Sequence, residues 1–179
     1  MSKRLNCGNG DYPMPFWINL DADPNRAADI HATVPPIPFA DGELDEIYAG
    51  HLIEHMGREV AGEFLRECYR CLKPGGILTV VVPDTREIMR RYLMGTIDCV
   101  EYPFGVWRPI KDLDTICALF LYSTVQESRH QWSYDAQSLR RAMERAGFTS
   151  LREIDRYMDK RIAIGAWYQV GCSGIKPES

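Results

Sequence analysis

Two glycines and an acid near the start of the chain have the spacing of a site for a nucleoside-bearing cofactor. Gly8 and Gly10 follow a short strand expected over residues 3–7, and Asp21 ends a second strand expected over 17–21. Glycines let the backbone approach a charged ligand closely, and an acid at the end of the second strand can accept hydrogen bonds from ribose hydroxyls. This pairing indicates an enzyme built around such a cofactor. The structural alternatives are a tight turn and a surface acid.

A second group of polar side chains follows the strand expected over residues 44–50. Its members are His51, Glu54 and His55. A histidine near the start of a helix tends to be neutral, because the positive end of the helix dipole disfavours its charged form, and a neutral imidazole can accept a proton. We therefore predict catalytic roles for Glu54 and His55, with helix capping as the alternative. We expect His51 on the cofactor side.

A third group precedes the last expected helix. His130 lies between Arg129 and the aromatic residues Trp132 and Tyr134. Polar groups that converge on an aromatic wall are typical of ligand pockets. We predict a catalytic role for His130 and substrate contacts for Arg129, Trp132 and Tyr134; the alternative for the histidine is a structural one.

A cluster of arginines lies in the helix expected over residues 86–93. Arg86, Arg90 and Arg91 are interpreted as a solvated helix face. If they instead point inward together with Arg108 and Lys111, they predict an anionic acceptor.

The cysteines give little sign of metal or redox chemistry. Cys68 and Cys71 form a CxxC, but this pair lies inside a helical pattern and no second pair of ligands follows at metal-binding spacing. We expect reduced thiols and no metal ion.

Composition indicates one soluble globular domain over residues 1–179, since 45% of the residues are hydrophobic and 26% are charged. No apolar run is long enough for a signal peptide or a membrane span, so we expect a cytoplasmic protein with no membrane partner. The net charge of −4 argues against a nucleic-acid partner.

The order of the expected elements is that of an α/β protein. The pattern predicts a Rossmann-like, mostly parallel sheet with an antiparallel C-terminal strand and helices on both faces. The turn Lys73–Gly76 is assigned to structure, because it ends a helix and begins a strand. Besides the strands named above, we expect helices over 58–72, 86–93, 114–122 and 135–146, and strands over 77–82, 148–154 and 164–172.

The connection between the first two strands is unusually short. Parallel strands normally need about a dozen or more residues of crossover, so the residues between 7 and 17 leave no room for a normal helix. We expect the first crossover helix to be shortened or absent. One face of the sheet would then be covered by a second copy of the chain, as in a homodimer, or by a variable, substrate-side insert over 85–128.

Several blocks in this order resemble the class I S-adenosylmethionine-dependent methyltransferases, of the type 11-like domain, in a subgroup with a short first loop. The blocks are Leu5–Gly10, Trp17–Asp21, Ile37–Phe39, Leu44–Tyr48, Glu54–His55, Arg66–Arg70, Leu72–Gly76 and His130–Phe148. The resemblance implies S-adenosyl-L-methionine as cofactor and S-adenosyl-L-homocysteine as product. The cofactor-binding residues that it implies are Asn6, Gly8, Gly10, Asp21, Ala22, Ile30, His31 and His51.

Methyl transfer from a sulfonium is an in-line displacement, so the resemblance implies a protein that mainly aligns nucleophile, carbon and sulfur. We expect O- or N-methylation of a small-molecule acceptor, with a base to remove its proton. One alternative is a non-catalytic cofactor-binding or scaffold protein that kept the fold. Another is a nucleic-acid methyltransferase. Against it stands the stretch His51–Glu54, where an Asn/Asp-Pro-Pro-aromatic motif would be expected.

Overall fold

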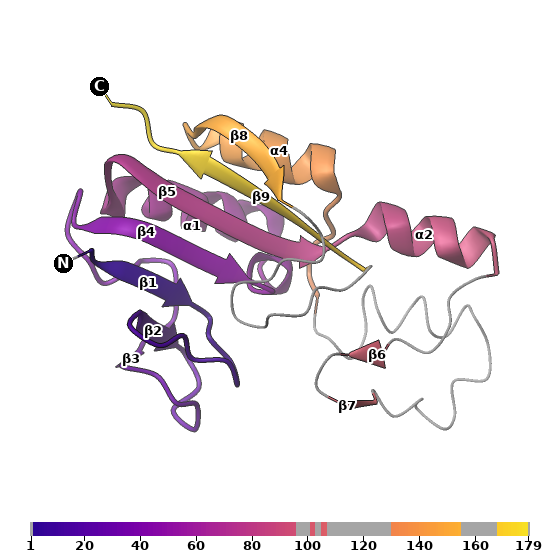
Figure 1. Cartoon of the computed structure of the whole chain (residues 1–179), viewed down its shortest axis with the longest axis horizontal. Helices are drawn as coiled ribbons and strands as arrows, with labels where there is room; N and C mark the ends of the chain where they lie inside the picture. The colour runs from indigo at the N-terminus through magenta and orange to yellow at the C-terminus, as the bar shows by residue number, and fades with distance from the viewer. Residues whose placement is uncertain (1, 96–100, 103–104, 107–129, 155–167, 179) are drawn as a thin grey trace.

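The fold is a seven-stranded sheet in the order β3-β2-β1-β4-β5-β9-β8 (Figure 1). The computed structural model describes residues 2–95, 101–102, 105–106, 130–154 and 168–178. β1 to β5 run parallel, and β9 is antiparallel to both β5 and β8. The α/β class with a mostly parallel sheet and an antiparallel C-terminal strand is therefore confirmed. The strands are β1 (Arg4–Cys7), β2 (Ile18–Asp21), β3 (Ile30–His31), β4 (Leu44–Gly50), β5 (Leu72–Pro83), β6 (Glu101–Tyr102), β7 (Gly105–Val106), β8 (Thr149–Ile154) and β9 (Gln169–Ile175); the helices are η1 (Ile53–His55), α1 (Arg58–Cys71), α2 (Thr85–Leu93) and α4 (Ala136–Arg145).

Two helices cover one face of the sheet. α1 and α4 contact each other, so they lie on the same face, and Figure 1 shows both behind the strands. The apolar stripe of α1 is buried at Ala61, Phe64, Leu65, Cys68 and Cys71, as its helical spacing predicts, whereas Val60, which the same spacing placed on this face, is 42% exposed. Helices on the second face stay a prediction. Within the described residues, no helix is long and apolar enough to cross a membrane.

The opposite face is covered near β4 and β5 by the connection between β1 and β2. Residues 8–17 contain no helix, which confirms that the first crossover helix is absent. Met14 from this connection packs with Tyr48 of β4 and Val81 of β5, and Trp17 lies against the same cluster. The short connection therefore supplies apolar cover that a crossover helix would otherwise provide.

Close packing also explains the glycine that begins this connection. Gly8 has φ +69°, and a Cβ atom there would come within 2.8 Å of Leu52 Cδ1, which belongs to the loop after β4. Gly10 has φ +52°, but a Cβ atom at Gly10 would meet open space. Both positions favour glycine for their backbone conformation, and Gly8 also for its close approach to Leu52.

The turn expected at Lys73–Gly76 lies inside a longer strand. β5 begins at Leu72, which pairs with Leu44, and the register between β4 and β5 shifts before Glu46 pairs with Ile77. Gly75 has φ +77°, so the chain bends here while the strand pairing continues on both sides. Pairing with β4 thus makes β5 begin earlier than its own sequence pattern predicts, although the backbone still bends at the expected turn.

In the C-terminal part, the last helix begins where the sequence predicts, whereas the last strand does not. Asp135 caps α4: its side chain accepts from the Ser138 N–H, and the Ser138 side chain bonds back to the Asp135 N–H, as a capping box. The last strand covers Gln169–Ile175, later than the expected 164–172, because it pairs along β5 as far as Ile77. The helix expected over 114–122 lies outside the described residues, as does most of the 85–128 insert.

The cysteines of the described chain are free and buried. Burial raises the pKa of the Cys71 and Cys172 thiols to about 11. Among the described residues, the side chains spaced closely enough to hold a metal ion are Glu54, His55 and His130, and none of them is a cysteine. These thiols are therefore small core side chains in the structure.

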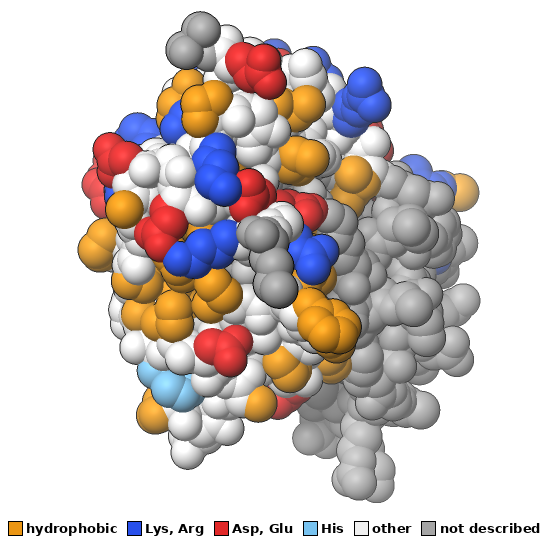
Figure 2. All heavy atoms as spheres, turned by 60° about the vertical axis from the view of Figure 1, so that its left-hand side comes forward, with side chains coloured by type: hydrophobic (Ala, Val, Ile, Leu, Met, Phe, Trp, Pro, Cys, Tyr) orange, Lys and Arg blue, Asp and Glu red, His pale blue; other side chains and the backbone are white. Residues whose placement is uncertain are grey.

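Arg70 ties the end of α1 to the loop before β4. Its guanidinium pairs with Glu67 and Asp41, and it donates to the carbonyls of Phe39 and Ile37, at 2.8 and 3.1 Å. Figure 2 brings this end of the sheet forward and shows acidic and basic side chains interspersed over it. The ion pair of Lys73 with Asp45, at 2.7 Å, belongs to the same region.

We predict that Arg70→Lys lowers the free energy of unfolding by about 1–3 kcal/mol, because a lysine cannot reproduce the planar set of bonds to carboxylates and carbonyls. Urea denaturation measures the change. Arg90→Lys is the control: Arg90 lies on α2 and pairs with Glu87 of its own helix, so its replacement should change stability by no more than about 0.5 kcal/mol. Equal effects of the two substitutions would contradict this role of Arg70.

We also predict that Gly8→Ala destabilises the protein more than Gly10→Ala. The left-handed backbone alone costs about 1–2 kcal/mol for an alanine, and only at position 8 must the new methyl group also displace Leu52, for about another 1 kcal/mol or more. Urea denaturation of both variants checks the difference. A loss at position 8 no greater than at position 10 would show that the Leu52 contact is unimportant.

Candidate functional site

The predicted cofactor residues lie at the carboxyl ends of β1, β2 and β4. These three strands are parallel neighbours, so their carboxyl ends form one edge of the sheet. The chain runs outward from β1 through β2 and β3, then returns to the other side of β1 for β4, so the strand order reverses between β1 and β4. In open α/β sheets, ligands bind in the crevice at such a reversal.

Asp21 holds the glycine loop in place. Its Oδ2 accepts a hydrogen bond from the Gly10 N–H at 2.7 Å, and its Oδ1 accepts one from the Asp23 N–H at 2.9 Å. The carboxylate is half-buried at the end of β2. Each carboxylate oxygen has two lone-pair sites, so both retain capacity for a hydroxyl donor from a ligand.

The other predicted cofactor residues divide between the core and the surface. Asn6 is fully buried, and its amide donates to Asn19 Oδ1 at 3.0 Å and to the Tyr12 carbonyl at 3.1 Å, so its side chain supports the loop from within. β3 pairs with β2 so that His31 lies opposite Asp21. Ala22 and His31 are exposed and Ile30 is half-buried. The structure thus places these three beside Asp21.

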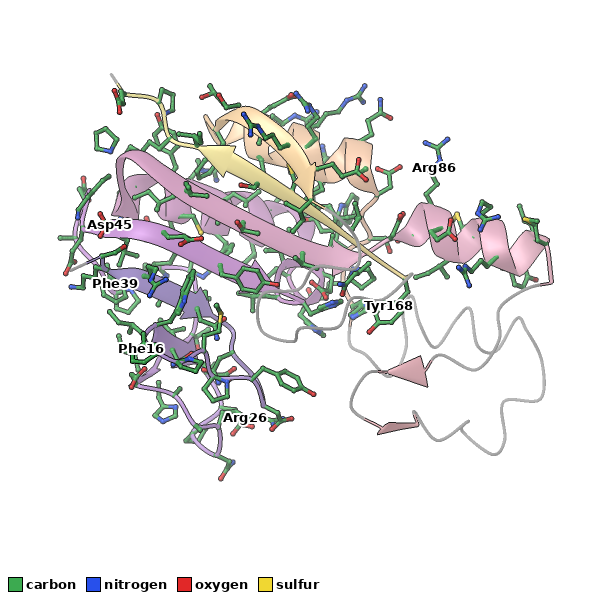
Figure 3. The ribbon with its side chains drawn as sticks, viewed as in Figure 1. Phe16, Arg26, Phe39, Asp45, Arg86 and Tyr168 are labelled. Atoms are coloured by element: carbon green, nitrogen blue, oxygen red, sulfur yellow. The ribbon has the colours of Figure 1, made fainter. Side chains whose placement is uncertain are left out.

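His51 connects the end of β4 to two other elements. Its φ of +51° turns the chain sharply after Gly50. Its ring Nε2 lies 3.2 Å from Gln169 Oε1 on β9, and its Nδ1 lies 3.2 Å from Glu54 Oε1. The ring of Tyr168, labelled in Figure 3, is 6.3 Å away. Sequence reasoning missed Gln169 and Tyr168, because no local pattern links residues 118 positions apart.

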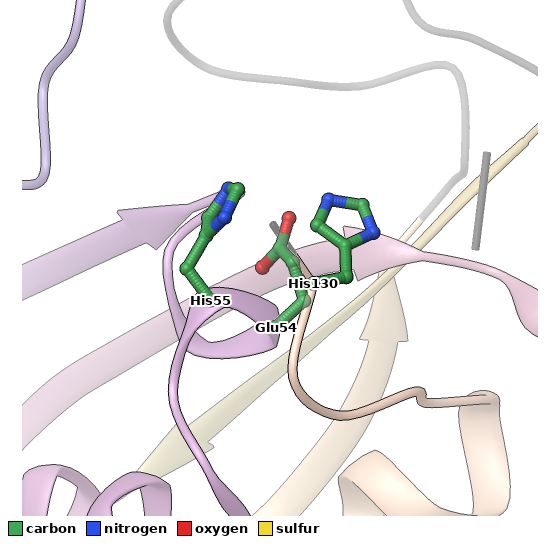
Figure 4. Close-up of side chains that lie close together, drawn as sticks. All are labelled: Glu54, His55 and His130. Carbon is green, nitrogen blue, oxygen red and sulfur yellow. The ribbon is translucent and has the colours of Figure 1, made fainter. Parts of the chain in front are cut away.

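The three predicted catalytic residues come together in space. One ligand atom each from Glu54, His55 and His130 lie within 4.8 Å of one another (Figure 4). The rings of His55 and His130 meet edge to face, with centroids 4.8 Å apart. The N–H groups of Gln131 and Trp132 both donate to the Glu54 carbonyl, at 2.8 and 3.2 Å. These backbone bonds hold His130 beside η1.

The Glu54 carboxylate is a buried negative charge. Its residue is 1% exposed, and neither oxygen accepts a hydrogen bond of normal geometry, although Oε1 forms the ion pair with His51. Burial raises the pKa of Glu54, but His51 and, less strongly, His55 lower it, and the net pKa is below the ordinary value. Burial, and then the charge of Glu54, raise the pKa of Tyr134 to about 12. The lowered pKa of Glu54 and the raised pKa of Tyr134 both indicate an ionised Glu54 carboxylate inside the protein.

Two of the predicted substrate residues, Trp132 and Tyr134, lie beside helices α1 and α4. Trp132 is 41% exposed, and the Arg58 guanidinium lies over its ring at 5.7 Å. Trp132 and the buried Tyr134 line an open hollow of about 800 Å³ between α1 and α4. None of the predicted cofactor residues lines this hollow, so it is separate from the carboxyl ends of β1 and β2. Arg129 lies outside the described residues.

Arg86 and Arg90 of α2 are exposed, and Arg91 is half-buried. Glu87 pairs with Arg90 at 2.7 Å and with Arg91 at 2.9 Å. Arg86 is exposed and points away from the sheet in Figure 3. This arrangement agrees with the first interpretation of the cluster. Arg108 and Lys111, which the anionic-acceptor hypothesis also required, lie outside the described residues.

Comparison with known proteins agrees with this architecture. Residues 10–153 match the family model of a methyltransferase domain. The trans-aconitate 2-methyltransferase of Acidovorax sp. (strain JS42) is 30% identical over 107 residues, which cover 50% of this chain and 41% of that protein. The chain therefore spans less than half the length of this curated relative.

Solved structures share the fold at low sequence identity. A methyltransferase from Thermotoga maritima, described as a possible histamine N-methyltransferase, superposes with a TM-score of 0.63 at 16% identity, covering 98% of this chain and 83% of that one. A methyltransferase from Archaeoglobus fulgidus gives a TM-score of 0.58 at 14% identity, with 98% and 86% covered. The family match extends over most of the chain, and the fold agrees with it: the chain belongs to the methyltransferase domain family.

Proposed function

We propose that this chain is an S-adenosylmethionine-dependent methyltransferase that acts on oxygen or nitrogen of a small-molecule acceptor. The observation that carries the proposal is the pairing of the Gly8–Gly10 loop with Asp21 across β1 and β2. Asp21 accepts the Gly10 N–H at 2.7 Å, so the loop and the acid form one unit at the strand-order reversal. Membership of the methyltransferase domain family supports it.

The residues present fit the cofactor. A side chain at Gly10 would enter open space, so the loop leaves room for a ligand directly beside Asp21. The half-buried Asp21 carboxylate can accept from the two ribose hydroxyls, and exposed His31 lies next to it for the adenine. When bound, S-adenosylmethionine supplies an activated methyl group on a sulfonium.

The protein's own contribution is alignment and proton removal. Gly8, Gly10 and Asp21 would fix the donor, so that an acceptor atom held near His51 lies in line with the methyl carbon and the sulfur. An acceptor hydroxyl or protonated amine must also lose a proton. The cluster of Glu54, His55 and His130 lies beyond the same strand, β4, and offers acceptor atoms for that proton.

The acceptor is proposed from charge and from a relative. The net charge of −4 and the interspersed charges in Figure 2 do not provide a polyanion-binding face in that view. The relative from Acidovorax is named for a small carboxylate, trans-aconitate. We therefore favour a small molecule over a nucleic acid.

Our test of the cofactor site is Asp21→Ala. Hydrogen bonds to a charged group contribute about 1.5–3 kcal/mol each, so the loss of two ribose bonds should weaken S-adenosylhomocysteine binding by about 100-fold or more. Isothermal titration calorimetry measures the affinity.

Asp29→Ala is the matched control. Asp29 also accepts a backbone N–H, that of Asn19 at 2.7 Å, but it precedes β3 and lies outside the proposed site. Its variant should bind S-adenosylhomocysteine within about threefold of the wild type, since it makes no proposed ligand contact. Unchanged affinity in Asp21→Ala would overturn the site assignment.

Methyl transfer itself is tested with methyl-tritiated S-adenosylmethionine. We expect label to appear in a small acceptor, tried first among low-molecular-weight carboxylic acids and amines, and not in RNA or DNA. Label in nucleic acid alone would refute the small-molecule assignment. Tight cofactor binding without transfer to any acceptor would instead support a non-catalytic role for the fold.

A further inference from the structure

We propose that Glu54, His55 and His130 form a binding site for one divalent transition-metal ion. The site lies beyond the carboxyl end of β4, next to the proposed cofactor crevice. Metal binding goes beyond the methyl transfer proposed above and can be measured without it.

The spacing of the donor atoms suits one ion. A carboxylate oxygen of Glu54 and one ring nitrogen from each of His55 and His130 lie within 4.8 Å of one another. Ligands at about 2.1 Å from a common metal ion are at most about 4.2 Å apart. Small rotations of the two rings therefore complete the site, and His55 is exposed and so has room to turn. Figure 4 shows the three side chains converging on one space.

The burial of the Glu54 carboxylate is an independent observation that points to a cation. It is buried to 1% exposure, and neither of its oxygens accepts a hydrogen bond of normal geometry. Within the described residues its ion-pair partner is His51, which is charged only when protonated. An ionised carboxylate costs several kcal/mol to bury unless it is paired or coordinates a metal. A cation between Glu54 and the two histidines removes this cost.

The neighbouring residues hold the ligands in position. His51 Nδ1 contacts Glu54 Oε1 at 3.2 Å while its other nitrogen contacts Gln169, so the ring orients the carboxylate. Gln131 donates its N–H to the Glu54 carbonyl and its side-chain amide to the His55 carbonyl, both at 2.8 Å. Outer contacts of this kind fix ligand geometry in metal sites and strengthen metal binding.

The donor set selects the class of metal. Two imidazoles and one carboxylate suit Zn²⁺, Fe²⁺ and related transition ions, whereas Mg²⁺ and Ca²⁺ prefer oxygen ligands. Three protein ligands also leave coordination positions open for an oxygen-bearing molecule.

A role for the ion in catalysis rests on the proposed function. A divalent cation lowers the pKa of a coordinated hydroxyl, whose proton then passes to solvent. The resulting oxygen forms its bond to the methyl carbon as the carbon–sulfur bond breaks, and the sulfur keeps the electron pair. With the ion bound, these side chains would hold the metal, which would take over the proton-removing role that the proposed function gives to the cluster itself.

The test uses Co²⁺ as a spectroscopic probe. The full chain is treated with chelator and titrated with Co²⁺, following the visible absorption of the bound ion. We expect saturation at one equivalent, at least a tenfold loss of affinity in His55→Ala and in Glu54→Gln, and no competition from equimolar Mg²⁺. Glu144→Gln, which removes an exposed carboxylate on α4, should change the affinity by less than about threefold.

The outcomes separate this inference from the proposed function. His55 is exposed, so its variant should stay folded, and urea denaturation of each variant verifies this. Three results would each overturn the metal site. The first is the absence of saturable Co²⁺ binding to the wild type, and the second is unchanged Co²⁺ affinity in both ligand variants. The third is intense near-ultraviolet charge-transfer absorption, which would show that thiolates bind the ion. Binding of S-adenosylhomocysteine to the wild type is measured in parallel. Its absence beside normal Co²⁺ binding would refute the cofactor site alone, and its presence without Co²⁺ binding would refute the metal site alone.

Discussion

The parallel pairing of β1 with β4 is the constraint on which the site depends. Leu5 pairs with Ile47 and Cys7 with Ala49, and all four are fully buried. Buried strands tolerate no slip in register, because a shift of one residue would turn every side chain to the other face. The register therefore fixes which residues follow the two strands at the crevice: the glycine loop on one side and His51 on the other. The contact between Gly8 and Leu52 is the direct result.

The second organising feature is a charge inside the protein. Glu54 stands at the junction between β4 and α1, where it is surrounded by three imidazoles and lies near Tyr134. Such an arrangement is poorly explained by stability, since apolar side chains of similar volume would pack there at lower cost. Buried ionisable groups with specific partners cluster at functional sites. The position of this cluster next to the crevice agrees with that rule.

Elements with strong local signals were predictable. The apolar stripe and the proline after it gave α1 its bounds to within one residue, and Asp135 with Ser138 gave the start of α4. The prediction for β4 matched the structure at both ends. The two-residue β3 and the early start of β5 were missed, because these residues become strand through pairing with neighbours and not through their own pattern. The absent crossover helix was predictable from length alone.

The sequence by itself determined the family, the order of the elements and the kinds of residue that could do chemistry, because glycine positions, capping residues and hydrophobic periods act over a few residues. It also singled out Glu54 and His55 as one group and His130 as part of another. Only the tertiary structure decided that these three share one space, that His51 links Glu54 to Gln169, and that Asn6 lies in the core. These contacts join residues as many as 118 positions apart in the chain, and no local pattern encodes such a distance.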